Sequence, residues 1–126
     1  MSKKRLTAAL ACLCLFAGSS ALAWTKENGR VKLRPEEISH CETLALDAAA
    51  IMVARQWNLP VSYMDEDAIP VQAREQARHQ LSDDVLNHPV RAGEAEKIEA
   101  LEAFVAASRR KCILDYIDSV PPTAIN

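Results

Sequence analysis

The chain has 126 residues, of which 25% are charged and 5% aromatic, and its 17 acidic and 15 basic side chains give a formal net charge of −2 at pH 7. A weakly acidic chain argues against binding to nucleic acid or to an anionic membrane surface, because both select for clustered positive charge. The length suits one domain with a modest hydrophobic core.

Residues 1–23 have the three parts of a secretory signal peptide in the right order. A basic start at Lys3 to Arg5 precedes an apolar stretch from Leu6 to Gly18 and a small-x-small cleavage site at Ala21 to Ala23. The apolar stretch is shorter than the ~20 residues needed to span a bilayer. We therefore expect cleavage after Ala23 and a periplasmic or secreted mature protein. Cleavage removes three basic residues and no acid, which leaves 12 basic and 17 acidic side chains and a net charge of −5.

Lipoprotein processing at Cys12 is the alternative, since residues 9–12 loosely resemble a lipid-attachment box. Only six residues separate Cys12 from the basic start, which is short for the apolar region of a signal. We therefore expect Cys12 and Cys14 to be removed with the signal. The mature chain then keeps two cysteines, Cys41 and Cys112, 71 positions apart.

In an oxidising compartment, an even pair of cysteines is expected to form a disulfide. The alternatives are two free thiols or zinc ligands. Zinc would need more Cys or His close by than this pair and His40, and His40 and Cys41 are neighbours, so we expect them on different faces of a helix. A disulfide across a loop of about 70 residues stabilises a domain by about 4 kcal/mol in the chain-entropy treatment.

The segment 24–34 is polar and is expected to be a flexible lead. A first helix is predicted from Pro35, with acidic residues in its first turn, to about Trp57. Leu59-Pro60 ends this helix. Ser62 and Asp65 form a capping-box-like pair, which predicts a short helical turn over 62–67.

A second helix is predicted from Pro70 to a point before His88-Pro89. Its apolar residues recur every four positions: Ala73, Ala77, Leu81 and Val85. A third helix is predicted from about Gly93 to residue 117, and residues 118–126 are expected to be a tail. No segment shows the alternation typical of a strand.

The two cysteines constrain how these helices are arranged. Cys41 lies near the start of the first helix and Cys112 near the end of the last, and bridged Cα atoms must lie within about 7 Å. The first and last helices should therefore run antiparallel, side by side, with the middle helix packed across them. The predicted fold is all-α: a small bundle of three main helices plus a short helical turn, with the first and last helices joined by the disulfide.

A pattern of residues over about 41–112 also carries a resemblance. It consists of Cys41-Glu42, Leu44-Ala45, Ala48, Ile51-Met52, Ala54-Arg55-Gln56, Pro60, Ser62, Met64, Pro89, Phe104 and Cys112. In this pattern the chain resembles a group of small, exported, single-disulfide helical proteins of bacterial genomes and prophages. The resemblance implies a helical fold, export and a disulfide, and it implies no particular activity. Residues 65–80 depart from the pattern of the group.

The histidines do not lie in a recognisable catalytic or metal motif. None of His40, His79 and His88 belongs to a nucleophile or zinc signature. His79 lies four residues before Asp83, and Asp84 four before His88, a spacing that is common in solvated pairs on surface helices. We therefore predict that the protein is not an enzyme and holds no cofactor or metal.

The segment 55–67 is the candidate partner-binding surface. It combines arginine, aromatic and methionine side chains, which are enriched at interface hot spots, with acids suited to steering a basic partner. The alternative is that its apolar residues complete the core. The candidate residues are Arg55, Gln56, Trp57, Tyr63, Met64, Asp65, Glu66 and Asp67.

Two binding functions fit these features. The first is a periplasmic antagonist, such as an immunity or inhibitor protein that blocks a secreted toxin or another envelope protein. The second is an acid-stress periplasmic chaperone. At low pH the carboxylates neutralise and the net charge would move from −5 toward +15, because the 12 Lys and Arg and 3 His residues stay charged. The resulting self-repulsion loosens a compact chain and exposes apolar surface.

Overall fold

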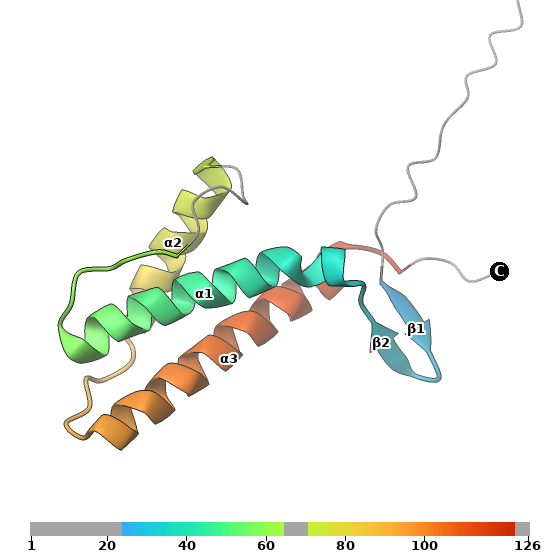
Figure 1. Cartoon of the computed structure of the whole chain (residues 1–126). Coiled ribbons are helices and arrows are strands. Elements are labelled where there is room, and N and C mark those ends of the chain that lie inside the picture. The colour runs from blue at the N-terminus through green and yellow to red at the C-terminus, as the bar shows by residue number, and fades with distance from the viewer. Residues whose placement is uncertain (1–23, 65–70, 123–126) are drawn as a thin grey trace, which may run out of the picture.

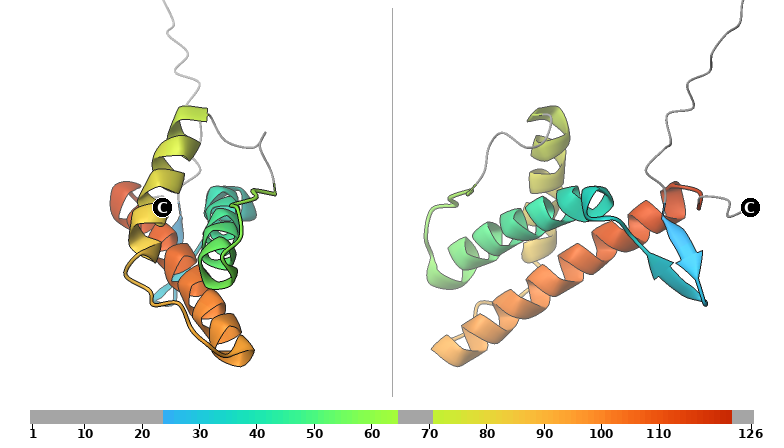
Figure 2. Two further views of the ribbon diagram at one scale, coloured as in Figure 1. Left: turned by 90° about the vertical axis from the view of Figure 1, so that its left-hand side faces the viewer. Right: turned by 45° about the vertical axis from the view of Figure 1, so that its right-hand side comes forward.

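A computed structural model describes residues 24–64 and 71–122 as a small hairpin followed by three helices (Figure 1). The hairpin strands are β1 (Thr25–Glu27) and β2 (Arg30–Lys32), and the helices are α1 (Pro35–Trp57), α2 (Val71–Val85) and α3 (Glu94–Ser119). Helices α1 and α3 pack side by side, and α2 crosses α1 (Figures 1 and 2). The expected signal peptide and the acidic run at 65–67 lie outside the described residues.

The three predicted helices are confirmed, with two differences in the segments around them. Helix α3 continues to Ser119, so the expected tail begins with two helical residues, and the Val120 N–H closes the helix on the Tyr116 carbonyl at 2.9 Å. Residues 61–63 have no regular structure and Met64 lies in a bend. The described part of the predicted turn over 62–67 is therefore not helical.

The prediction that the chain contains no strand is wrong. β1 and β2 form an antiparallel hairpin with Glu27 opposite Arg30, and Asn28 and Gly29 make its two-residue turn. Both turn residues have positive φ, 49° and 75°, as a type I′ turn requires, and Asn-Gly is the dipeptide that adopts it most readily. The Trp24 indole N–H then donates to the Val120 carbonyl at 2.6 Å, so the segment expected to be a flexible lead contacts the end of α3.

Helix α1 is fixed at both ends by residues suited to those positions. At its start, the buried Glu37 carboxylate accepts a hydrogen bond from the Arg34 backbone N–H at 2.6 Å and another from the Tyr116 hydroxyl at 2.9 Å. At its end, Asn58 adopts the left-handed conformation, which asparagine tolerates well, and the Leu59 N–H bonds the Ala54 carbonyl at 2.9 Å.

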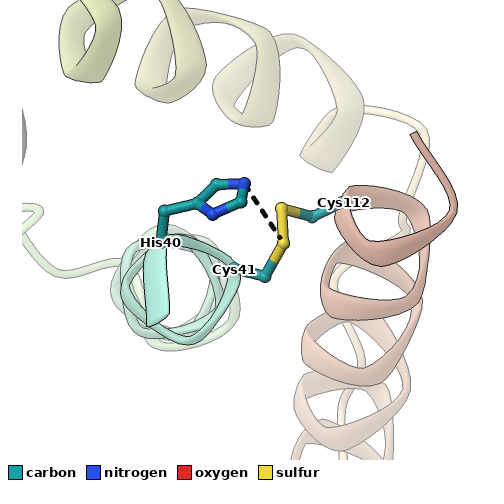
Figure 3. A group of neighbouring side chains, drawn as sticks. All are labelled: His40, Cys41 and Cys112. Atoms are coloured by element: carbon teal, nitrogen blue, oxygen red, sulfur yellow. Dashed lines mark hydrogen bonds between the residues drawn. A yellow bond between two sulfur atoms is a disulfide. The ribbon is translucent and has the colours of Figure 1, made fainter. Parts of the chain in front are cut away.

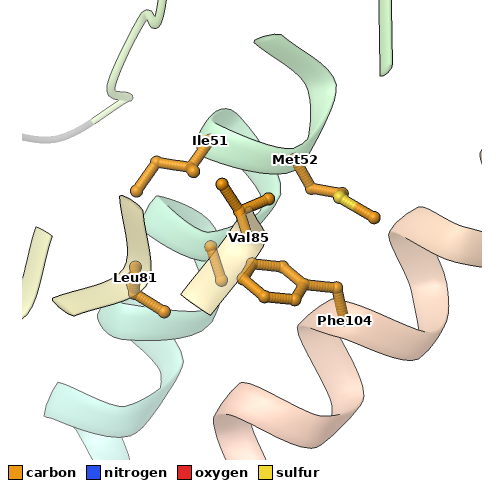
Figure 4. Packing of buried hydrophobic residues seen from close by; sticks show 6 residues of the cluster. Ile51, Met52, Leu81, Val85 and Phe104 are labelled. Carbon is orange, nitrogen blue, oxygen red and sulfur yellow. The ribbon is translucent and has the colours of Figure 1, made fainter. Parts of the chain in front are cut away.

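The core lies where the three helices meet (Figure 4). Ile51 and Met52 of α1 pack against Leu81 and Val85 of α2, and Phe104 of α3 closes the cluster. Leu81 and Val85 belong to the predicted stripe of α2, whereas Ala73 of the same stripe is exposed. In α3, Phe104 is buried and Leu101 is partly buried against the cluster. Among the described residues, no helix is both long and apolar enough to cross a membrane.

Paired contacts join α1 to α3 along much of their length. The predicted disulfide is confirmed, with Cα atoms of Cys41 and Cys112 5.6 Å apart. One residue further along α1, the Glu42 carboxylate forms an ion pair with Arg109 at 2.6 Å. At the far end of α1, the Trp57 indole N–H donates to a Glu94 carboxylate oxygen at 3.0 Å. The two helices are thus held by covalent, ionic and hydrogen-bonded contacts in series.

Candidate functional site

Two residues of the candidate partner-binding surface make hydrogen bonds within the chain. The Arg55 guanidinium donates to the His88 carbonyl at 2.7 Å. The Gln56 side chain is 2% exposed, and its amide donates to the Pro89 carbonyl at 3.0 Å and accepts from the Arg91 N–H at 2.8 Å. These bonds tie the end of α1 to the loop between α2 and α3. A structural role therefore accounts for the polar groups of both residues, and their part in partner binding stays a prediction.

The remaining described residues of that surface differ in exposure. Trp57 is half-buried against the start of α3, with the Lys97 ammonium 5.5 Å from its ring centroid. Tyr63 packs against the core, with the Arg78 guanidinium 3.6 Å above its ring. Met64 is 83% exposed. Met64 is the residue of this group that is most available to a partner, whereas Asp65, Glu66 and Asp67 lie outside the described residues.

A groove of about 620 Å³ opens between the three helices beside the disulfide. Leu81 and Phe104 are core residues, whereas Ala107 is exposed, so the groove runs from the core to the surface. A volume of this size can accept several apolar side chains of a partner or a small ligand. The apolar lining comes from all three helices: Leu44, Ala77, Leu81, Phe104 and Ala107.

The polar lining of the groove contains two carboxylates and one lysine, together with His40 and His88. The Lys111 ammonium donates to the Asp115 carboxylate at 2.9 Å, and this hydrogen bond, together with the charge of Asp115, raises the pKa of Lys111. Asp84 contributes a second carboxylate from α2, whose charge also acts on Lys111. With two carboxylates beside one lysine, the lining can accept a cationic group of a ligand.

Tyr116 closes the groove near the start of α1. Its hydroxyl donates to Glu37, and burial followed by the Glu37 hydrogen bond raises the pKa of Tyr116. Tyr116 also faces His40, with ring centroids 6.2 Å apart. The buried carboxylate and the phenol therefore fix the wall of the groove that lies next to the disulfide.

His40 and the disulfide form a close group at this wall (Figure 3). The His40 Nε2 atom lies 3.4 Å from the Cys41 Sγ atom. His40 is exposed and Cys41 is buried, as expected of neighbours on different faces of a helix, but the imidazole turns back toward the sulfur. His40, Cys41 and Cys112 place three potential metal-ligand atoms within 4.8 Å of one another. In this oxidised form, however, the two sulfurs are bonded to each other and are not free thiolates, which are what a metal would need.

The pair of His79 and Asp83 on α2 is a weak candidate for a metal site. His79 Nδ1 and an Asp83 carboxylate oxygen are 4.0 Å apart, and both side chains are largely solvated, at 83% and 72% exposure. A solvated pair of this kind contributes little, and the described part of the chain adds no further ligands that would complete a metal group there. Both residues are therefore suited to control substitutions.

The groove is the feature that sequence reasoning did not identify. The stripe of α2 carries alanine at position 77, and α3 carries alanine at 107, where larger residues would fill the space between the helices. Small residues on facing stripes were therefore the available signal. Their meaning depends on how α2 crosses α1, which the spacing alone does not give.

Comparisons of the chain with protein-family models, with curated proteins and with solved structures found no match.

Proposed function

We propose that this is an exported protein that acts by binding another protein, in the manner of an immunity or inhibitor protein, and that the groove holds an apolar segment of a basic partner. The observation that carries the proposal is the groove itself: an apolar recess open to the surface and walled by three helices, of which α1 and α3 are cross-linked by the disulfide. A preformed recess costs little ordering on binding, which favours tight and specific contact.

The arrangement of the helices supports a rigid site. The contacts of Glu37 with Tyr116, Cys41 with Cys112, and Trp57 with Glu94 are what two antiparallel helices would make. With α1 and α3 fixed in this way, the walls of the groove on these two helices keep their spacing.

The charge of the groove supports a basic partner. Asp84 and Asp115 stand at the rim with one lysine between them, and the mature chain expected from the sequence has a net charge of −5. Opposite charge speeds the encounter of two proteins and selects among partners, even where it adds little affinity.

Matched variants on neighbouring positions test the proposal. Ala107→Trp would fill the groove, whereas Ala106→Trp adds the same bulk to an exposed position of α3 outside it. Asp84→Lys reverses a rim charge, and Asp83→Lys reverses a neighbouring charge off the groove. The mature oxidised protein would be immobilised, and its partners from periplasmic and secreted extracts identified by mass spectrometry at neutral pH.

The expected result is one stoichiometric basic partner that the two groove variants lose and the two controls keep. A partner that all four variants retain would bind elsewhere, with the exposed Met64 region as the first alternative. Recovery of no partner at neutral pH would overturn the proposal and favour the second function.

The second function, an acid-stress chaperone, is supported by two buried carboxylates that join helices. The Asp47 carboxylate forms an ion pair with Arg78 of α2 at 3.0 Å, and the Glu37 carboxylate accepts a hydrogen bond from the Tyr116 hydroxyl of α3. At low pH the mature chain expected from the sequence gains positive charge, and the resulting self-repulsion would open apolar surface while the disulfide limits the expansion. A chaperone should then prevent aggregation of client proteins only below about pH 4, where carboxylates titrate. Protection absent at every pH would exclude this function.

A further inference from the structure

The two sulfurs of the disulfide differ in their surroundings. Cys41 is 0% exposed, whereas Cys112 is partly exposed and lines the groove. Because Cys112 lines the groove and Cys41 does not, we expect a thiolate that enters the groove to attack Cys112. Because thiol–disulfide exchange requires direct attack on one sulfur, this asymmetry fixes which bond forms and which sulfur leaves.

The leaving sulfur has a hydrogen-bond donor beside it. His40 Nε2 lies 3.4 Å from Cys41 Sγ, so the imidazole, as its Nε2–H tautomer or as imidazolium, can donate to a thiolate formed there (Figure 3). Histidine next to cysteine stabilises the thiolate, and a better-stabilised thiolate leaves faster. The arrangement matches what exchange at this disulfide needs: an accessible sulfur to attack and a stabilised one to release.

We propose that the Cys41–Cys112 disulfide is a site of thiol–disulfide exchange with peptide or protein dithiols. The substrate thiolate attacks Cys112 from the groove, and His40 stabilises the thiolate released on Cys41. The apolar lining of the groove suits a substrate cysteine flanked by apolar residues. This activity does not depend on the binding function proposed above, because its co-reactant is a dithiol of any origin.

The exchange balances in two steps. In the first, a substrate thiolate forms a bond to Cys112 Sγ, the Cys41–Cys112 bond breaks, and its electron pair stays on Cys41 as thiolate. In the second, the other thiolate of the substrate attacks its own mixed-disulfide sulfur and releases Cys112 as thiolate. The substrate leaves oxidised as a disulfide, and the protein is reduced by two electrons, with its two thiolates taking up protons from solvent according to pH.

Two measurements on the mature oxidised protein test the proposal. In the first, reduced glutathione is added without denaturant, the reaction is quenched with acid, and peptide mapping by mass spectrometry locates the glutathione adduct. In the second, the rate of reduction by dithiothreitol is compared between the parent protein, His40→Gln and the control His79→Gln. His79 is an exposed histidine of α2 paired with Asp83, so its variant removes an imidazole away from the disulfide.

We expect the adduct on Cys112 and reduction of His40→Gln slower by about threefold or more, with His79→Gln at the parental rate. In dithiothreitol redox buffers, a threefold loss of thiolate stabilisation corresponds to a reduction potential about 14 mV more negative. A purely structural role of His40 would change the melting temperature and would not shift the potential in this direction.

Three results would overturn the proposal. The first is an adduct found mainly on Cys41, the second is an unchanged rate and potential in His40→Gln, and the third is a disulfide that reacts only after denaturant is added. Circular dichroism of both variants checks that they are folded. The location of the adduct is measured on the parent protein, so it stands even if His40→Gln does not fold.

Discussion

Replacing Gln56 with leucine tests whether the end of α1 is a structural joint or a free binding surface. The side chain is 2% exposed and spans two backbone groups of the loop, the Pro89 carbonyl and the Arg91 N–H. Leucine has a similar size but no polar atoms, so both groups lose their partner. A backbone group left without a partner costs about 1–3 kcal/mol.

The lower end of that range applies here, because Pro89 and Arg91 are exposed residues and water can reach part of the loop. We therefore expect Gln56→Leu to lower the free energy of unfolding by about 2 kcal/mol, from about 1 kcal/mol for each of the two groups. For a domain of about 100 residues this lowers the melting temperature by about 8–16 °C. Chemical and thermal unfolding of the mature oxidised protein, followed by circular dichroism, measures both quantities.

The matched control is Gln76→Leu. Gln76 lies on the exposed face of α2, where the same substitution should change stability by no more than about 0.5 kcal/mol. If Gln56→Leu were as harmless as this control, the two hydrogen bonds would not stabilise the fold, and the structural account of this end of α1 would be wrong. Gln56 would then be available to a partner, as its place in a segment rich in hot-spot residues suggested.

Three further perturbations follow from the contacts between helices. Asp47→Ala should lower the free energy of unfolding, measured by urea denaturation, by about 2–3 kcal/mol, because it leaves the largely buried Arg78 guanidinium without its carboxylate partner. A loss below about 0.5 kcal/mol would contradict this. Reduction of the disulfide should cost about 4 kcal/mol in the chain-entropy treatment, measured by melting with and without reductant, and an unchanged melting temperature would refute it. Burial raises the pKa of Tyr63, partly offset by Arg78, and burial with the Glu37 hydrogen bond raises that of Tyr116. Both phenols should therefore have a pKa above 10.0 in an ultraviolet titration, and a phenol with a pKa of 10.0 would contradict the assignment. The free energy of unfolding should fall as the pH rises past 10.0, because the tyrosines of the unfolded chain lose their protons first.

The helices and the disulfide could be predicted because each depends on local or single-pair information. The apolar stripe of α1 and the proline at its start give a period and a boundary, and α1 begins and ends where they predict. If Cys12 and Cys14 belong to the expected signal peptide, one pairing of the remaining cysteines is possible, and the structure contains it. The hairpin was missed because strands of three residues are too short to show alternation, although Asn28-Gly29 was a turn signal strong enough to find it.

The groove could not be predicted because it depends on geometry between elements far apart in sequence. Its lining joins Leu44 of α1, Ala77 of α2 and Ala107 of α3, and no spacing in the sequence relates these three positions. The contact of His40 with the disulfide was missed for a related reason. Helical neighbours point about 100° apart at Cβ, but a long side chain can turn back toward its neighbour's sulfur, as His40 does.

The segment 55–57 shows why composition alone does not separate a structural role from partner binding. Arginine and tryptophan are enriched at interface hot spots because each combines a large contact area with directed hydrogen bonds. Long polar side chains can also join the end of a helix to a loop of the same chain. Arg55 and Gln56 do this by donating hydrogen bonds to the carbonyls of His88 and Pro89. Hot-spot composition therefore indicates contact but not whether the contact is inside the chain or with a partner. The groove differs in this respect, because its apolar lining is not filled by other side chains among the described residues, and the binding proposal therefore rests on it.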